Sequence, residues 1–589
     1  VATGTYRIQQ RDKVFFPRIL FDKKLYPNCD SSVWLRSCGE EVNEPLPGEI
    51  TGAIPTWLRG TLLRNGPGSI NVGSMRFDHL FDSSALLHRF AIRDGDVTYQ
   101  CRFLQCNTFK KNRAANRIVV SEFGTSAVPD PCHSVFDRIA ALFNPGESMS
   151  DNAMISLYPF GDEMYAFTEG PVIHRIDPVT LDTLERKNLM ESVALVNHTS
   201  HPHVMPNGVE NLMLSIFLSG DMFKSAHIVG SMKPRWPLNP AYMHTFGVTE
   251  NYFVIVEQPL SVSVCGLIRG QLTNKPFASC LRWYPDHETH IVLISRKTGK
   301  EEKRFRTETM FFLHIINTFE QDGKLVVDLC AYKDAKVIDA MYISAMESMQ
   351  SNPDYANWFR GRPKRLEVAL DAPPLARVQP RALADLGCET PRIHYDLYNG
   401  NIRVYPFTTY TQLTSSGRAI KNQRSRKEEP QQGNTKHLLL SYLRFKQKNS
   451  YFHYYYYYEL HPQIIFCDLI YFYIMFSGKP YRYFYAISSD VDTENPGLII
   501  KVDTRTGSRL TWCDRDCYPS EPVFVPRPEA KEEDDGVLLS ALVWGANRDR
   551  EVALLVLDAR TLKEMARAHF QTPSEAPKCL HGWYLPERT

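Results

Sequence analysis

The sequence predicts an all-β chain folded as a β-propeller, and three observations support this prediction. A hairpin pattern recurs, in which an apolar run is followed by a turn with Thr before Gly or Leu, and then by a more polar strand. The copies fall at multiples of about 60 residues, which suits four-stranded blades. Other strand-like runs lie between the copies. Two stacked β-sandwiches are the alternative that this periodicity leaves open.

The four hairpin copies share an Asp or Ser at the start of the turn, where the side chain can accept hydrogen bonds from the backbone ahead. They span Val172–Lys187, His290–Phe305, Leu498–Trp512 and Ala553–Phe570. The turn residues Asp503 and Asp558 are 55 residues apart. Asp177 and Ser295 are 118 residues apart, about twice that distance.

One long segment breaks the period. Ser295 and Asp503 are 208 residues apart, and the intervening residues 401–477 contain a five-Tyr tract and many Asn, Lys, Ile and Phe residues. Without this segment the interval becomes about 130 residues, close to two periods. We therefore predict one propeller domain, formed by residues 45–400 and 478–589 after an N-terminal extension at 1–44. Residues 401–477 are predicted to be an insertion, disordered or translated from non-coding sequence, since a long surface loop adds little closure entropy.

Composition excludes several functional classes. Lys and Arg number 68 against 66 Asp and Glu, a net charge of +2, so no nucleic-acid partner is expected. With 43% hydrophobic residues, the chain is not mainly disordered. Thirteen Cys without a CxxC pair indicate a reduced, intracellular compartment.

No segment predicts a secretory signal or a membrane span. The N-terminal VATGTYRIQQRDK lacks a basic region followed by an apolar one, and because the first residue is Val, upstream residues could be missing. The longest apolar run, at about 464–476, contains Asp468 and is shorter than the roughly 20 residues that cross a bilayer. The expected location is cytoplasmic.

A short amphipathic helix is predicted within Pro129–Gly146. Such a helix either packs on the core or lies in a membrane interface, and periodicity alone leaves both open. Its apolar face consists of Val135, Phe136, Ile139, Leu142 and Phe143.

The histidines show no local metal motif, since none of the eighteen has HExxH or HxxxH spacing. In a propeller, however, the innermost strand of each blade faces the axis, so ligands come singly from distant parts of the chain. Taken one at a time, each such His is more often a hydrogen-bonded core residue than a ligand. Those in apolar or strand-like surroundings are His198, His201, His203, His244, His314 and His581.

Eight ordered motifs resemble those of the carotenoid cleavage oxygenase family. They are RGTLLRNGPG (59–68), FDHLFDSSALLHRF (77–90), PDPC (129–132), SHPHVMPNG (200–208), HTFGVTENYFVIVE (244–257), HIINTFE (314–320), SEPVFVPRP with EEDDG (520–536) and HGWY (581–584). PDPC and EEDDG indicate the animal branch. The resemblance runs from about Pro45 to Tyr584, with the insertion excluded.

This resemblance implies a seven-bladed propeller in which short helices and loops form a cap and a membrane-facing entrance. It also implies one Fe(II) on the axis, with dioxygen as co-substrate. The implied iron ligands are His201, His244, His314 and His581. Four neutral imidazoles would leave the metal its full charge and open coordination positions.

Further residues match positions around the iron of that family. His198 and His203 fall outside the matched ligand position and are interpreted as structural. Thr168 is implied to lie near the dioxygen site. The carboxylates that would accept imidazole N–H groups, and so fix the tautomer of each ligand, are Glu169, Glu389 and Glu521.

The implied reaction is oxidative cleavage of the central double bond of a carotenoid to two retinal-type aldehydes, with all-trans to 11-cis isomerisation of one half. Because the substrate is a long apolar polyene, we expect an apolar tunnel and peripheral contact with an intracellular membrane through residues 135–143. Cys132 is interpreted as an ordinary thiol, with an acyl anchor as the alternative. Three other functions remain open: a retinoid isomerohydrolase acting on retinyl esters, an eccentric-cleavage oxygenase, and a non-enzymatic carotenoid-binding scaffold if the insertion disturbs Glu389.

Overall fold

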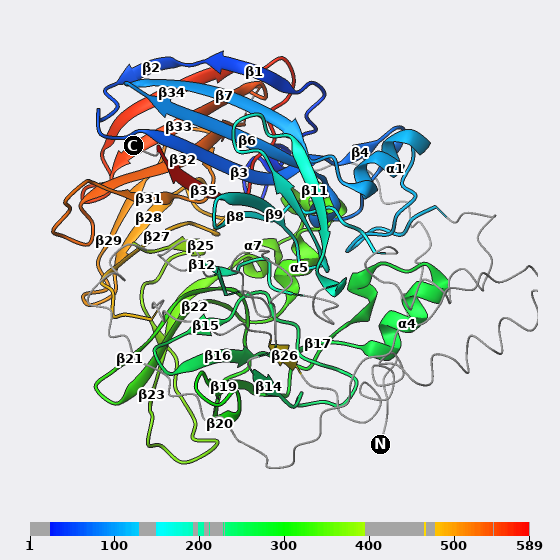
Figure 1. Cartoon of the computed structure of the whole chain (residues 1–589), viewed down its shortest axis with the longest axis vertical. Coiled ribbons are helices and arrows are strands. Elements are labelled where there is room, and N and C mark those ends of the chain that lie inside the picture. Colours follow the sequence, from blue (N-terminus) through cyan, green and yellow to red (C-terminus); the bar gives the residue numbers. More distant parts are fainter. Residues whose placement is uncertain are drawn as a thin grey trace, which may run out of the picture.

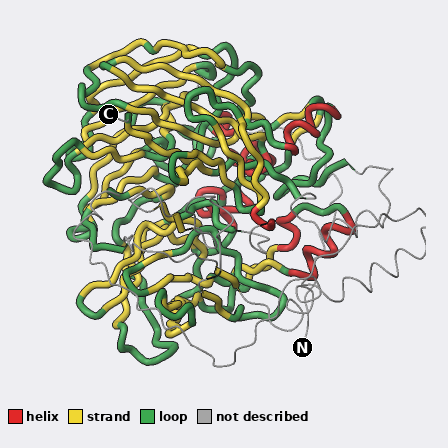
Figure 2. Tube along the Cα trace, viewed as in Figure 1, coloured by secondary structure: helices red, strands yellow, loops and turns green. Residues whose placement is uncertain are grey.

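The computed structural model describes residues 24–128, 149–191, 198–204, 211–212, 228, 230–394, 464–466, 478–545 and 547–587. Antiparallel strands dominate this part of the chain, and the helices are few and short (Figures 1 and 2). The prediction of a mainly β architecture is therefore confirmed. The apolar face at 135–143 and Cys132 lie outside the described residues.

Six sheets of four or more strands occur in the described ranges. The first contains β1 (Val42–Pro47), β7 (Asp96–Phe103), β6 (Ser84–Arg93), β3 (Gly60–Ser69) and β35 (His581–Pro586). The second contains β11 (Thr183–Asn188), β10 (Val172–Ile176), β9 (Glu163–Phe167) and β8 (Ser156–Phe160). The third contains β15 (Gly247–Val248), β16 (Tyr252–Glu257), β19 (Thr289–Ser295) and β20 (Glu301–Thr307).

The other three sheets follow in chain order. The fourth contains β21 (Phe311–Gln321), β22 (Lys324–Tyr332), β23 (Arg362–Ala369) and β24 (Arg381–Ala382). The fifth contains β25 (Glu389–Arg392), β27 (Tyr483–Ile487), β28 (Ile499–Asp503) and β29 (Arg509–Trp512). The sixth contains β2 (Glu49–Gly52), β34 (Glu564–Gln571), β33 (Glu551–Asp558), β32 (Gly536–Trp544), β30 (Cys517–Pro519) and β31 (Val523–Pro526).

Shorter elements connect these sheets. The two-stranded pairs are β4 (Asn71–Val72) with β5 (Met75–Arg76), β12 (His203–Val204) with β13 (Asn211–Leu212), β14 (Gly230–Met232) with β26 (Ile464–Phe466), and β17 (Leu260–Val262) with β18 (Leu281–Trp283). The α-helices are α1 (Asn107–Ala115), α4 (Val264–Thr273), α5 (Lys336–Ala340), α6 (Ile343–Glu347) and α7 (Tyr355–Trp358). The 3-10 helices are η1 (Ser31–Trp34), η2 (Leu80–Asp82), η3 (Leu189–Glu191), η4 (Phe277–Cys280) and η5 (Met349–Ser351). None of the described helices has the length and apolar character needed to cross a bilayer.

All four predicted hairpins are present, as β10–β11, β19–β20, β28–β29 and β33–β34. The predicted role of the turn Asp is also confirmed. One carboxylate oxygen each of Asp177, Asp503 and Asp558 accepts hydrogen bonds from the backbone N–H groups two and three residues ahead.

The Gly or Leu that ends the motif occupies a left-handed position in every copy. The backbone φ is 67° at Gly299 and 71° at Gly507, and it is 61° at Leu181 and 53° at Leu562. Gly adopts this conformation without steric conflict, whereas Leu rarely does. Leu181 and Leu562 are both buried, so packing of their side chains compensates for the unfavourable backbone.

The two ends of the described chain meet in the same sheets. β3 pairs with β35, and Asn65 stands opposite His581. β2 pairs with β34, so the blue and red strands lie side by side in Figure 1. Long-range pairing of this kind fixes the position of His581, although it is close to the C-terminus.

The residues that flank the predicted insertion belong to one sheet, because β25 before it pairs with β27 after it. Within 401–477 the structure describes residues 464–466, which form β26 and pair with β14. The described part of the predicted N-terminal extension packs on the rest of the domain: Val33 is buried in a core cluster with Leu62 and Leu86, and the Tyr26 hydroxyl donates to the Asn352 carbonyl at 2.8 Å.

Asp82 gives the fold a pH dependence. The Asp82 carboxylate is buried and accepts hydrogen bonds from the Gly124 N–H and the Thr125 hydroxyl. Burial raises the pKa of Asp82 from 3.8 to about 7. The folded state therefore holds a proton that the unfolded state releases, and this stabilisation is full below about pH 4 and lost as the pH rises to about 7.

We expect Asp82→Asn to weaken this pH dependence, because the amide keeps an acceptor for Gly124 but does not titrate. The free energy of unfolding of the variant minus that of the parent protein should be larger at pH 8 than at pH 5. The increase should be at least about 1.4 kcal/mol, the equivalent of one pKa unit. Urea unfolding at the two pH values measures the gain. An equal stability difference at both pH values would contradict a titrating Asp82.

Candidate metal centre

Four histidines from distant parts of the chain converge at one place. His201 precedes β12, His244 precedes β15, His314 lies in β21, and His581 begins β35. The His201 ring centroid lies 4.7 Å from that of His244, 5.0 Å from that of His314 and 4.5 Å from that of His581. The structure thus brings together all four residues that the sequence resemblance selected.

The nitrogen atoms of this cluster fit a metal ion. Ligand atoms of His201, His244 and His314 all lie within 4.8 Å of one another. The Nε2 atoms of His201 and His244 are 3.0 Å apart. Metal to imidazole nitrogen distances are about 2.1 Å, so two ligands at a right angle would be separated by about 3.0 Å. Nε2 of His314 is buried with no hydrogen-bond partner among the described residues, as expected of an atom reserved for a metal.

Three of the four imidazoles are paired with carboxylates through Nδ1. Nδ1 of His244 lies 2.5 Å from Oε1 of Glu169, and Nδ1 of His581 lies 2.9 Å from Oε1 of Glu521. His314 makes the same contact with Glu389. Because an ionised carboxylate only accepts hydrogen bonds, Nδ1 carries the proton and Nε2 keeps its lone pair for a cation.

Tyrosine hydroxyls donate hydrogen bonds to two of these carboxylates. The Tyr242 hydroxyl donates to Glu169 Oε1 at 2.7 Å, and the Tyr332 hydroxyl donates to Glu389 Oε1 at 2.7 Å. Glu389, which is half-buried, accepts a further hydrogen bond from the Thr390 N–H at 3.0 Å. Burial alone would raise the pKa of Glu389, but the contacts with His314 and Tyr332 more than offset it and hold this pKa below its ordinary value.

Two arginines hold the third carboxylate. Arg392 donates to both oxygens of Glu521, at 2.8 Å and 3.1 Å, and Arg64 lies 3.4 Å from Oε2. All three side chains are almost completely buried. Burial would raise the pKa of Glu521, but the positive charge of Arg392 dominates and holds it well below its ordinary value. Glu521 is therefore ionised throughout the physiological pH range.

Burial favours the neutral imidazole at His581 and His201. Burial lowers the pKa of His581 to about 4, with Glu521 opposing the shift. Burial, followed by the neighbouring imidazoles, holds the pKa of His201 well below its ordinary value. Neutral rings present lone pairs, which is the state that binds a metal.

His201 differs from the other three members, because its Nδ1 atom lies 3.1 Å from the Tyr158 hydroxyl.

The other predicted residues lie near the ligands in the chain. Thr168 is half-buried between β9 and Glu169. His198 contacts the Thr199 carbonyl through Nδ1, and His203 contacts the Phe246 carbonyl through Nε2, which agrees with structural roles for both.

Sequence reasoning predicted the three carboxylates but missed the side chains that contact these carboxylates and His201. One of them had a usable signal, since Tyr242 lies only two residues before His244 in the chain. Tyr158, Tyr332 and Arg64 had none, since each reaches the site from a strand whose register depends on the assembled fold.

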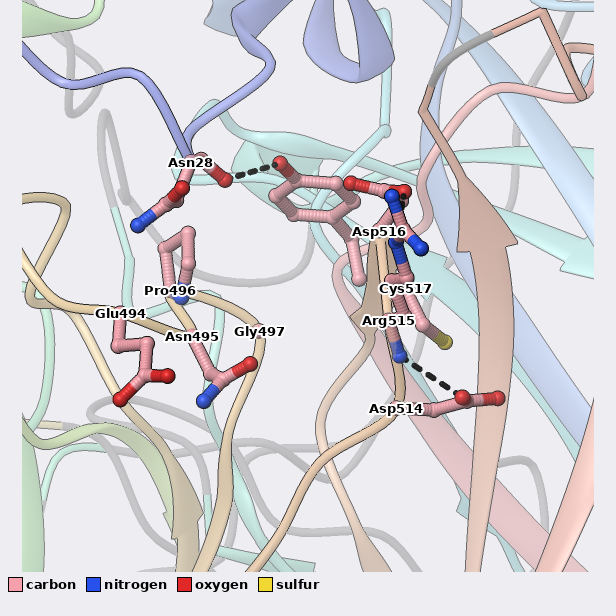
Figure 3. A pocket seen from close by; sticks show the side chains of 10 residues that line it. Asn28, Glu494, Asn495, Pro496, Gly497, Asp514, Arg515, Asp516 and Cys517 are labelled. Carbon is pink, nitrogen blue, oxygen red and sulfur yellow. Dashed lines mark hydrogen bonds and ion pairs between the residues drawn. The ribbon is translucent and has the colours of Figure 1, made fainter.

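A separate hollow of about 270 Å³ contains none of these residues (Figure 3). It is lined by residues 28, 494–497 and 514–518, among them the acidic Glu494, Asp514 and Asp516. Asp514 is already paired with Arg567 at 2.7 Å, and Asp516 lies 3.4 Å from Arg515. Its lining residues are distinct from those of the metal centre.

This fold and this site belong to a known class of protein. The model of the retinal pigment epithelial membrane protein (RPE65) family matches residues 35–436 and 410–586, so the chain is a member of that family. Among curated relatives, the carotenoid isomerooxygenase of Galleria mellonella is 64% identical over 584 residues, covering 96% of this chain and 99% of that protein. The carotenoid isomerooxygenase of Drosophila melanogaster is 48% identical, covering 98% of this chain and 96% of that protein.

More distant relatives extend the comparison. The beta,beta-carotene 15,15'-dioxygenase of Mus musculus is 33% identical, with 93% of this chain and 90% of that protein covered. A solved structure of a mutant Synechocystis apocarotenoid oxygenase superposes with a TM-score of 0.65 at 20% identity, covering 95% of this chain and all of that one. A cobalt-substituted form of the Synechocystis protein gives a TM-score of 0.65, with 95% and 99% coverage. At this identity the superposition shows a common fold.

Proposed function

We propose that this chain is an iron-dependent oxygenase that cleaves the central double bond of a carotenoid and isomerises one half of it from all-trans to 11-cis. In the proposed reaction dioxygen is consumed, and its two oxygen atoms end in the two retinal-type aldehydes. The observation that carries this proposal is the convergence of four imidazoles, three of them backed by carboxylates, in a chain 64% identical to a carotenoid isomerooxygenase.

In this proposal His201, His244, His314 and His581 hold Fe(II), which supplies redox chemistry with dioxygen. The protein positions the ligands, keeps their Nε2 lone pairs free and excludes water from the buried site. Thr168 is proposed to lie beside the dioxygen position because it directly precedes Glu169 in the chain. No side chain is required as a general acid or base.

We also propose that the sheets are blades of a seven-bladed propeller with a single catalytic domain. The contacts between edge strands of successive sheets support a ring: β8 contacts β35 and β12, β21 contacts β15 and β25, and β31 contacts β35. Six of these strands come from the six larger sheets, one from each, and the seventh is β12 of the two-stranded pair β12–β13. The pairing of β25 with β27 supports residues 401–477 as an insertion into one blade.

A cytoplasmic location with peripheral contact to an intracellular membrane completes the proposal. A carotenoid is an apolar polyene that partitions into bilayers, so the enzyme has to take it from one. The apolar face at 135–143, together with a loop-and-helix cap around the entrance, is the part of the sequence suited to that contact.

Product analysis tests the function. We expect iron-loaded protein incubated with zeaxanthin in air to give two retinal-type aldehydes, one of them 11-cis, and none under nitrogen. Chromatography of both reactions provides the measurement. A longer apocarotenal would instead indicate eccentric cleavage, product formed from a retinyl ester without dioxygen would indicate an isomerohydrolase, and bound but intact pigment would indicate a scaffold.

A further inference from the structure

The four imidazoles are held in two different ways. His244, His314 and His581 each contact a carboxylate through Nδ1. At His201 the corresponding atom faces the Tyr158 hydroxyl at 3.1 Å, and the two rings are nearly perpendicular, 86° apart with centroids at 6.3 Å. The described residues show no carboxylate at this Nδ1 atom.

The position of the Tyr158 ring is fixed by its surroundings. Tyr158 lies in β8 and is 5% exposed. Its ring packs edge-on against Phe167, with centroids at 5.9 Å, and in a tilted arrangement against Trp583, with centroids at 5.4 Å. Trp583 lies in β35, two residues after His581, so the second and first sheets together determine where the hydroxyl points.

We propose that Tyr158 is a positioning residue that accepts the Nδ1–H of His201, and that His201 is consequently the most weakly bound of the four metal ligands. This inference rests on the proposed function. If Nε2 of His201 faces the metal, the proton of the neutral ring is on Nδ1 and the phenol oxygen must be its acceptor. An uncharged phenol oxygen polarises an imidazole less than a carboxylate does, so His201 donates less electron density to a cation.

The experiment uses the metal-free full-length protein titrated with cobalt(II) chloride, whose visible absorption reports the ligand field. We expect Tyr158→Phe to weaken cobalt binding about 10-fold, the lower end of the range for loss of a hydrogen bond to a ligand, and to shift the cobalt bands. Tyr165→Phe is the matched control. Tyr165 stands opposite Tyr158 on the neighbouring strand and is equally buried, but its hydroxyl donates to Glu163 at 2.8 Å. The control should change neither affinity nor spectrum.

A second pair of variants tests the ligand ranking without altering Tyr158. His201→Ala should weaken cobalt binding less than His314→Ala does. If Tyr158→Phe binds cobalt with the affinity and spectrum of the parent protein, or if His201→Ala weakens binding as much as His314→Ala, the inference is wrong while the metal centre stands. If the parent protein binds no cobalt, the proposed metal centre itself fails.

Discussion

His244→Ala is expected to abolish iron binding and, with it, carotenoid cleavage. The substitution removes the Nε2 atom that lies 3.0 Å from Nε2 of His201, and it leaves Glu169 without its imidazole partner. Iron content should fall from about one atom per chain to below about a tenth, because each lost ligand removes several kcal/mol of binding free energy. Elemental analysis of the purified variant gives the iron content, and chromatography gives the activity.

His203→Gln is the control for this variant. His203 lies two residues from His201 and contacts the Phe246 carbonyl, outside the cluster. We expect the control to retain iron and activity. Iron retained by His244→Ala, or lost equally from both variants, would contradict the assignment of His244 as a ligand.

Glu521→Gln is expected to destabilise the fold far more than the corresponding change at Glu169. Glu521 is the ion-pair partner of two buried arginines, and neutralising it removes the carboxylate charge that Arg64 and Arg392 share. Breaking a buried ion pair of this kind costs about 3–5 kcal/mol. Urea unfolding of the metal-free variant gives the free energy of unfolding directly.

Glu169→Gln is the matched comparison, since Glu169 also accepts an imidazole N–H but has no arginine partner among the described residues. Its side chain is 20% exposed, so the free energy of unfolding should fall by about 0.5–1.5 kcal/mol, the net contribution of an ordinary hydrogen bond. Both variants should bind metal about 10–100-fold more weakly. Equal destabilisation by the two substitutions would show that the arginines do not depend on Glu521.

The repeated hairpins could be predicted from sequence because their turn geometry depends on adjacent residues. Asp503 bonds the backbone immediately ahead of it, and Gly507 takes the left-handed conformation, so both signals are local. The assembly of the sheets could not be predicted in this way. The pairing of β3 with β35 joins residues more than 500 positions apart, and no local pattern encodes it.

The metal ligands could be selected only through the motifs that resemble a family. Their spacing alone does not distinguish His201 from His203, which lies two residues away and contacts a backbone carbonyl. The tyrosines that contact Glu389 and His201 escaped prediction for a related reason. Tyr332 reaches Glu389 from β22, and Tyr158 reaches His201 from β8, so their roles depend on packing between sheets.

X-ray absorption at the iron edge of the iron-loaded protein shows whether the four histidines ligate the metal together. We expect a first shell containing four imidazole nitrogens at about 2.1 Å and no sulfur. A shell with fewer than four imidazoles, or with a cysteine sulfur or a directly bound carboxylate in their place, would contradict that expectation.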